Sequence, residues 1–443
     1  MRSKLLAATS LIIVLAVSAC GGSDESDLPE LRPFTPEQAE RLHTLRDGIA
    51  ALRGLPVASG VDEGSITREA YQAYSGSGLE SLSEEDRAEL EFYNEIWRLM
   101  RLTGPEDDLF TDIVEGYGAG VLGFYEFDSD ALVLVDDSPD GKLSLSEEST
   151  IAHEYVHSLQ DARFDLSAFV EDAEPEEGVI DERSTTLDCV YEGDASLAEE
   201  LYMAQEHGED WADAEDAGGE LTPEQIETFL SIPPVILDYI TFNYDECARF
   251  IKAVYADGGW AKVDELYANP PLTTEQILHP EKYFAGEQAV EITDTDFAEL
   301  LGEGWTRSER SAFGEFDSGA LLRASGIPER DSIVAADGWA GGSIAHYLHG
   351  EGTDREAVVH LSLRFDTEQD FAEFGFAFGF AIVLQGWNVS PEADHIYWYE
   401  GEDAGYALQD LETLQFDIIY STDATAAGVA KAALQDGLAM RSE

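Results

Sequence analysis

Residues 151–160 read IAHEYVHSLQ and place His153, Glu154 and His157 in the order HExxH. On an α-helix, side chains four residues apart project from the same face, so the two imidazoles can bind one metal ion. Glu154 lies about 100° around the helix from His153, which lets its carboxylate reach a water molecule on that metal. The stretch therefore predicts a zinc hydrolase, with Zn²⁺ as cofactor and Glu154 as general base. The alternative is a helix that carries two solvated or core histidines.

A catalytic zinc also needs a third protein ligand and an open position for water. A downstream histidine at the spacing HExxHxxGxxH is excluded, because Gln160 and Arg163 occupy the places that this pattern needs. The stretch VYEGDAS at 190–196 offers Glu192 instead, on a second helix expected over 181–208. We predict Glu192 as the third ligand; the alternative is an ordinary acidic residue in an acidic chain.

Two further carboxylates lie close to Glu192 in the sequence. Asp188 precedes it by one helical turn on the same face, and Asp194 follows it by two residues. A carboxylate that accepts a hydrogen bond from a ligand imidazole fixes the orientation of that ring. We therefore predict Asp188 and Asp194 as the residues that support the two histidines.

Three motifs together resemble a known class of enzyme. They are HEYVHSLQD at 153–161, EGDA at 192–195 and TTEQILHPEKY at 273–283. The first two resemble the gluzincins, the metallopeptidases in which a glutamate completes the HExxH zinc site. All three resemble uncharacterised bacterial lipoproteins, and this likeness extends from about Leu52 to beyond Trp339.

The resemblance implies a zincin-like fold, namely a mainly helical metallopeptidase domain with a small β-sheet. It implies a peptide or protein substrate, and it implies that the zinc ligands are His153, His157 and Glu192. It also implies that a strand, here ALVLV at 131–135, presents an edge beside the metal to which an extended peptide can add. The chain departs from the best-known gluzincins at Ser196, where they often have aspartate.

The third motif has its own local pattern. Thr273 and Gln276 can form a capping box, and Pro280 prevents the helix from continuing. His279 or Tyr283 is then a candidate donor to the oxyanion that forms during peptide hydrolysis. The alternative is that His279 caps its own helix.

The N-terminus reads as a targeting segment. Arg2 and Lys4 precede the apolar run LLAATSLIIVLAVSA, which has the length of a signal peptide. VSAC at 17–20 resembles a bacterial lipobox, so we predict cleavage of a signal peptide over 1–19 and lipidation of Cys20. The protein would then be held outside the cytoplasmic membrane by lipid. The alternative is a plain cleaved signal or an uncleaved anchor.

The charge is strongly acidic. Lys and Arg number 25 and Asp and Glu number 92, which gives a net charge of −67. Such a field repels nucleic acid and anionic membrane surfaces, so we expect no nucleic-acid partner and contact with the membrane through the N-terminal lipid alone. The acidic residues are spread along the whole chain, which favours a salt-adapted surface over an acidic recognition surface.

Two cysteines remain after the lipobox, Cys189 and Cys247. In an exported protein they can form a disulfide that joins two helices. Two separate buried thiols are an equal alternative.

The fold class expected from the whole chain is α+β. A tether over 20–33 leads into a catalytic domain over 34–325, and a C-terminal α+β region follows over 326–443. FYEF and ALVLV predict a strand pair before the HExxH helix, and the helix over 181–208 is expected to break or bend at Gly193. The other helices are predicted over 35–53, 83–102, 143–164, 222–230, 234–256, 259–268, 367–384 and 423–437, and the C-terminal strands over 356–367, 395–401 and 414–422.

Overall fold

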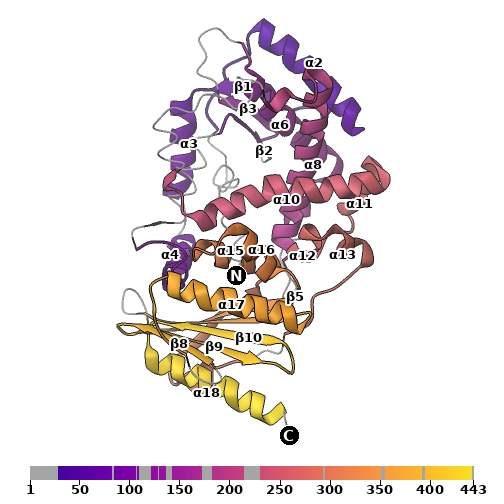
Figure 1. The fold of residues 1–443 in the computed structure, drawn as a ribbon. Helices are drawn as coiled ribbons and strands as arrows, with labels where there is room; N and C mark the ends of the chain where they lie inside the picture. Colours follow the sequence, from indigo (N-terminus) through magenta and orange to yellow (C-terminus); the bar gives the residue numbers. More distant parts are fainter. Residues whose placement is uncertain are drawn as a thin grey trace.

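The computed structural model describes residues 28–81, 84–105, 107–108, 121–127, 129–135, 142–171, 182–213, 230–292, 295–350, 355–391 and 395–441. The predicted signal peptide, the lipidation of Cys20 and nearly all of the helix over 222–230 lie outside this part of the chain. The architecture is α+β, as predicted. In Figure 1, N-terminal helices and a small sheet form one end of the molecule, α10 crosses its middle, and a larger C-terminal sheet forms the other end. Among the described residues, no helix is long and apolar enough to cross a membrane.

The N-terminal sheet contains β1 (Asp62–Ile66), β2 (Gly123–Glu126) and β3 (Ala131–Val135) in the order β1-β3-β2. β2 and β3 pair antiparallel, which confirms the predicted strand pair. β1 was not predicted, and it pairs parallel to β3. The stretch ALVLV is therefore the central strand, so the prediction that it forms the edge beside the metal is wrong. Among the described residues, β2 forms the edge on that side.

Three helices pack around this sheet. α2 (Pro36–Arg53) begins at a capping box, in which Thr35 and Gln38 satisfy each other's backbone N–H groups. α6 (Leu145–Phe164) carries the HExxH stretch, and α8 (Arg183–His207) carries EGDA. Their apolar faces share one buried core with β2 and β3. The core fixes α6 against α8, and thus the two halves of the predicted site against each other.

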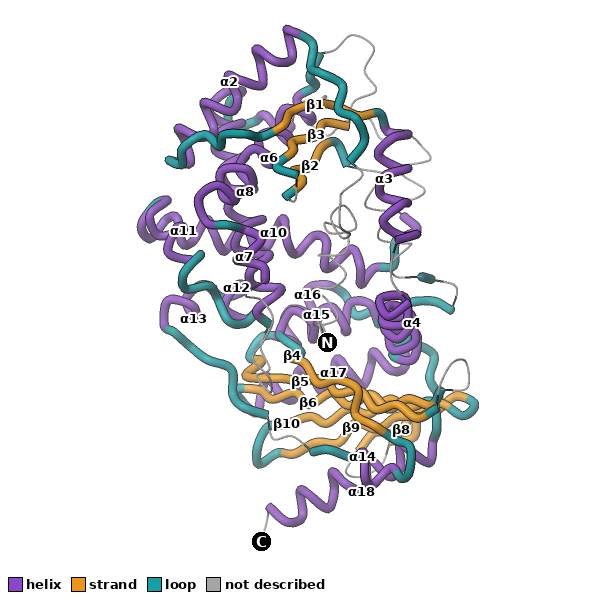
Figure 2. Tube along the Cα trace, turned by 180° about the vertical axis from the view of Figure 1, so that it is seen from behind, coloured by secondary structure: helices purple, strands orange, loops and turns teal. Residues whose placement is uncertain are grey.

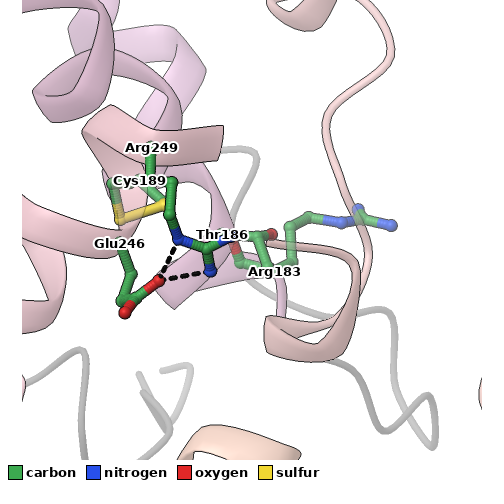
Figure 3. Close-up of a disulfide and its surroundings, with 6 residues drawn as sticks. Arg183, Thr186, Cys189, Glu246 and Arg249 are labelled. Carbon is green, nitrogen blue, oxygen red and sulfur yellow. Dashed lines mark hydrogen bonds and ion pairs between the residues drawn. A yellow bond between two sulfur atoms is a disulfide. The ribbon is translucent and has the colours of Figure 1, made fainter. Parts of the chain in front are cut away.

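α8 passes through Gly193 as one continuous helix, so of the predicted break or bend the break does not occur. The glycine instead lets α10 (Pro234–Gly258) approach closely, because a Cβ at this position would lie 2.5 Å from the carbonyl oxygen of Cys247. At the same contact Cys189 and Cys247 form a disulfide, which resolves the alternative left open by the sequence. Figure 3 shows this bridge joining the two helices.

The motif at 273–283 forms two short helices. α12 begins after Thr273, whose hydroxyl accepts from the N–H of Gln276 as predicted. The side-chain oxygen of Gln276 accepts instead from the N–H of Leu272, so the box is not closed as predicted. The other helices before α15 are α3 (Arg68–Ser81), α4 (Glu84–Leu99), α7 (Leu166–Glu171), η1 (Trp211–Asp213), α11 (Trp260–Leu266), α12 (Thr274–Leu278), α13 (Pro280–Ala285) and α14 (Ala298–Leu301).

The C-terminal sheet has the order β4-β5-β6-β10-β9-β8-β7, and each neighbouring pair is antiparallel. Its strands are β4 (Thr306–Ala312), β5 (Trp339–His349), β6 (Glu356–Phe365), β7 (Asn388–Pro391), β8 (His395–Glu400), β9 (Asp403–Asp410) and β10 (Gln415–Ser421). Because β4 pairs with β5, the sheet begins before residue 326. The predicted boundary between 325 and 326 therefore runs through this sheet.

Helices cover both faces of the C-terminal sheet. α15 (Glu315–Ala324), α16 (Glu329–Ala336) and α17 (Glu368–Leu384) lie on the side that faces α10, and α18 (Ala424–Arg441) lies on the other side (Figure 2). Val359, Leu361 and Leu363 of β6 enter the core shared with α15 and α17. The opposite face of β6 is also buried, because α14 and α18 pack over it.

Candidate metal centre

The three predicted ligands converge between α6 and α8. Nε2 of His153 lies 3.1 Å from Oε2 of Glu192, and Nε2 of His157 lies 3.7 Å from the same oxygen. The two imidazole rings meet edge to face, with centroids 4.7 Å apart. All three side chains are buried. Two ring nitrogens and one carboxylate thus face a common point, which is the donor set of a glutamate-completed zinc site.

The other nitrogen of each ring is held by an acceptor. Nδ1 of His153 lies 3.2 Å from Oε2 of Glu199, and Nδ1 of His157 lies 2.9 Å from Oε1 of Gln160. An ionised carboxylate and an amide oxygen can only accept, so each Nδ1 carries the proton. Nε2 of each ring faces Glu192, and this nitrogen becomes a metal ligand when it gives up its proton, so the rings have the orientation that metal binding requires.

The predicted supporting carboxylates occupy different places from those expected. Asp194 accepts from Arg53 Nε at 2.7 Å and from Gln160 Nε2 at 3.1 Å, so it acts on His157 through Gln160 and not directly. Asp188 accepts from Tyr191 at 3.2 Å. Its second oxygen has no hydrogen-bond donor in the part of the chain that the structure covers, and burial raises the pKa of Asp188 to about 8. The direct contacts to the imidazoles that were predicted for Asp188 and Asp194 are made by Glu199 and Gln160.

Glu154 lies between the histidine pair and the N-terminal sheet. Its Oε2 accepts from the backbone N–H of Tyr125 in β2 at 2.9 Å. Its carboxylate and the ring nitrogens of His153 and His157 all lie within 4.8 Å of one another. Burial, opposed by His153, raises the pKa of Glu154 to about 8. A half-buried carboxylate in this position is placed to exchange a proton with a group held at the histidines.

The electrostatics of the centre favour a cation. Burial alone would lower the pKa of His153, but hydrogen bonds to Glu192 and Glu199 raise it well above its ordinary value. Burial lowers the pKa of His157. The pKa of Glu192 is lowered against the effect of burial, because His157 and His153 stabilise its charge. Carboxylates converge on two imidazoles here, and a buried divalent ion would balance their charge.

Sequence reasoning missed Glu199 and Tyr244. Glu199 follows Glu192 by seven residues, or two helical turns, so the helical period puts it on the same face and a search at that spacing finds it. The ring of Tyr244, on α10, lies 6.0 Å from that of His153, and the side chain is 37% exposed. No local pattern indicates Tyr244, because the packing of α10 against α8 brings it to the centre.

The residues predicted as oxyanion donors lie elsewhere. The hydroxyl of Tyr283 donates to the backbone oxygen of Asn269 at 2.8 Å, and its ring packs edge-on against Phe250. Nε2 of His279 lies 2.9 Å from Glu315, in a separate cluster. The described contacts of Tyr283 and His279 therefore do not join either residue to the metal centre.

Comparisons with known proteins give no further guide to the site. No protein-family model, no curated protein and no solved structure is similar to this chain. The chemistry of the site is therefore argued from its own residues. Two imidazoles, a carboxylate and an adjacent second carboxylate suit metal-assisted hydrolysis.

Proposed function

We propose that this protein is a zinc-dependent metallopeptidase of the gluzincin type. One observation carries the proposal: Nε2 of His153 and Nε2 of His157 face the same oxygen of Glu192 inside the protein, with Glu154 beside them. Three protein ligands of these types leave a fourth position for water, as in catalytic zinc sites. The acceptors on each Nδ1 fix the tautomers that such a site requires.

The residues around the ligands have distinct roles in this proposal. Zinc bound there would polarise the substrate carbonyl and lower the pKa of its water toward ~7. Glu154 would act as the general base toward the attacking water and would pass the proton to the leaving amine. The N–H of Tyr125 holds the Glu154 carboxylate toward the histidines. Burial of the centre strengthens each of these charge interactions.

β2 supplies the surface for the peptide. It is the edge of the N-terminal sheet among the described strands, and the N–H of Tyr125 points away from β3 because it reaches Glu154. An extended peptide that adds to this edge places a carbonyl next to the metal centre. The role that the sequence analysis gave to ALVLV therefore passes to its neighbouring strand.

Tyr244 takes the role first given to His279 or Tyr283. It is partly exposed and its ring lies 6.0 Å from that of His153, so its hydroxyl can approach an oxyanion at the metal. Loss of one oxyanion donor typically lowers kcat by about 10²–10³-fold. Tyr244→Phe should therefore lower kcat, leave KM nearly unchanged and leave bound zinc unchanged. Equal kcat in both proteins would remove Tyr244 from the mechanism.

The decisive experiment measures zinc and peptide cleavage together. Full-length protein is purified in high salt, and its zinc content and its cleavage of casein or a quenched peptide are compared between wild type and Glu154→Gln. We expect both proteins to bind zinc at the site that contains His153. Only wild type should cleave the substrate. Glu148→Gln is the matched control, because Glu148 lies on the same helix but pairs with Arg41.

Two outcomes would overturn the proposal in different ways. Zinc in both proteins without cleavage would indicate a hydrolase for another amide or ester, or a structural zinc. No zinc in wild type would indicate a non-catalytic surface lipoprotein that binds a ligand or partner. The lipid anchor at Cys20 and the extracytoplasmic location remain proposals from the sequence. A Cys20→Ala variant that still partitions with membranes would contradict them.

A further inference from the structure

A second group of potential ligands lies in a cavity of about 510 Å³. α10, α12, α15 and α16 supply the side chains that line the cavity, among them His279 and Glu315. Asp337 lies beside these two residues, with one ligand atom within 4.8 Å of theirs. Glu246 and Arg249 of α10 also line the cavity, and Figure 3 shows them next to the disulfide. None of these residues takes part in the proposed peptidase chemistry.

The three side chains have the spacing of metal ligands. Nε2 of His279 lies 2.9 Å from Oε1 of Glu315 and 3.7 Å from Oδ1 of Asp337. One ligand atom from each residue lies within 4.8 Å of the other two. Zinc bonds of ~2.1 Å to nitrogen and oxygen in a tetrahedral site separate the ligand atoms by roughly 3.4 Å. The observed distances need only small side-chain shifts to reach this geometry.

Each ligand is held at the end of a helix. His279 stands between α12 and α13, where Pro280 starts the second helix. Glu315 is the first residue of α15, and Asp337 follows the last residue of α16. Positions next to helices are more rigid than those in long loops, and the three groups lie close together in the structure without an ion.

Glu315 provides the independent sign of a missing ligand. The residue is 4% exposed, and its Oε1 faces His279. Across the described ranges, no donor reaches its buried Oε2. A buried carboxylate oxygen without a hydrogen-bond partner is unfavourable, because nothing compensates for its lost hydration. A simple His279–Glu315 hydrogen bond explains Oε1 alone, whereas a metal ion beside the carboxylate would satisfy both oxygens.

The two arginines in the cavity wall form ion pairs with residues other than Glu315. Arg323 is paired with Asp238 at 2.8 Å, and Arg249 is paired with Glu246. A contrasting group nearby, Glu275, Glu287 and Asp366, already surrounds the ammonium of Lys282. That second group already surrounds a lysine, whereas among the described residues no lysine or arginine forms an ion pair with Glu315 or Asp337.

We propose that His279, Glu315 and Asp337 bind a second divalent transition-metal ion, of the class of Zn²⁺ or Mn²⁺. An imidazole ligand disfavours Ca²⁺ and Mg²⁺, which prefer oxygen donors alone. Asp337 is 66% exposed, so one side of the ion remains open to water. The ion would join the TTEQILHPEKY segment to α15 and α16. The proposal does not depend on the peptidase activity.

The test counts sites by metal titration. Metal-depleted full-length protein is titrated with Zn²⁺ and, separately, with Mn²⁺, in molar NaCl and excess Mg²⁺ so that surface carboxylates do not contribute. We expect two sites in wild type and one in the His153→Ala/His157→Ala variant. Adding Glu315→Gln to that variant should remove the remaining site. If Asp337→Asn is added instead, the affinity of the remaining site for the metal should fall by more than about tenfold.

Glu329→Gln is the matched control, because Glu329 lines the same cavity but is not one of the three ligands. It should leave the remaining site unchanged. If Glu315→Gln does not fold, the exposed Asp337→Asn decides the question. Unchanged binding in folded Asp337→Asn and Glu315→Gln variants would overturn the proposal, as would a His153→Ala/His157→Ala variant that binds neither metal.

Discussion

Oε2 of Glu199 lies 3.2 Å from Nδ1 of His153, seven residues beyond Glu192 on the same helix. Oε1 of Glu199 also accepts from the hydroxyl of Ser149. The gluzincin pattern expected an aspartate at the position of Ser196. Here the support for the first histidine comes from one turn further along α8, where the longer glutamate side chain spans the gap.

Glu199→Gln should weaken zinc binding by about 10–100-fold, because the imidazole of His153 loses its charged acceptor. Zinc affinity is measured by competition with a chelator. Glu200→Gln is the control, because Glu200 is exposed and pairs with Lys252 on the surface. Equal affinity in both variants would show that Glu199 does not orient His153.

Arg53→Met should lower the free energy of unfolding by about 3–5 kcal/mol, because it leaves the fully buried Asp194 without its partner. The guanidinium of Arg53 also pairs with Asp264 and lies 4.6 Å from the ring centre of Trp260. Denaturant unfolding gives the change. Arg41→Met, which removes a partly exposed ion pair, should lower the free energy of unfolding by only about 0–1 kcal/mol. Similar losses in the two variants would contradict this account.

The site was more predictable than its surroundings, for a physical reason. The spacing of His153 and His157 is a property of one helix, so sequence alone indicates that they share a face. Glu192 was found because an apolar helix pattern surrounds it. Tyr244 was not found, because its position depends on how α10 packs against α8. The catalytic assignment of His279 and Tyr283 rested on a motif whose place in the fold the sequence could not show.

In the fold, too, local features were predicted from the sequence and features that depend on long-range packing were not. The strand pair of β2 and β3 is local and was predicted. β1 has the polar sequence DEGSI, and it exists because it pairs in parallel with β3 far along the chain. That pairing turned the expected edge strand into a central one. Gly193 was interpreted as a helix breaker by its local propensity, whereas the structure uses its lack of a side chain for a close helix contact.

Gly193→Ala should destabilise the protein by about 1–3 kcal/mol, because the added methyl group meets the backbone of Cys247. Thermal unfolding detects the loss. Gly428→Ala is the control, because Gly428 lies within α18 and a Cβ there meets nothing within 4 Å. That change should be neutral or stabilising by up to about 1 kcal/mol. A neutral Gly193→Ala would mean that α10 can move away at little cost.

The Cys189–Cys247 bridge should stabilise the same helix contact. It closes a loop with a sequence separation of 58, for which chain entropy predicts up to about 4 kcal/mol. Cys189→Ala/Cys247→Ala should therefore unfold at a lower temperature than wild type. Adding a reductant should lower the midpoint of wild type toward that of the variant and leave the variant unchanged. If the Cys189→Ala/Cys247→Ala variant unfolds at the same temperature as oxidised wild type, the disulfide does not stabilise the protein.

Stability should fall as pH rises, because of Glu182. Burial, with the nearby Asp317, raises the pKa of Glu182 from about 4.5 to about 8, and both its oxygens accept from Thr274. Between these values the folded protein keeps a proton that the unfolded chain has lost, so raising the pH favours unfolding. The contribution of Glu182 to the free energy of unfolding is complete below about pH 4.5 and is lost as the pH rises through about 8.

One such proton changes the free energy of unfolding by at most about 1.4 kcal/mol per pH unit. Glu182→Gln removes the titration and keeps an acceptor for Thr274, so its stability should depend less on pH between 5 and 8 than that of wild type. Denaturant unfolding at several pH values measures this slope. Glu209→Gln, at an exposed position, should keep the wild-type slope. Identical slopes in wild type and Glu182→Gln would show that Glu182 is ionised in the folded protein throughout this range.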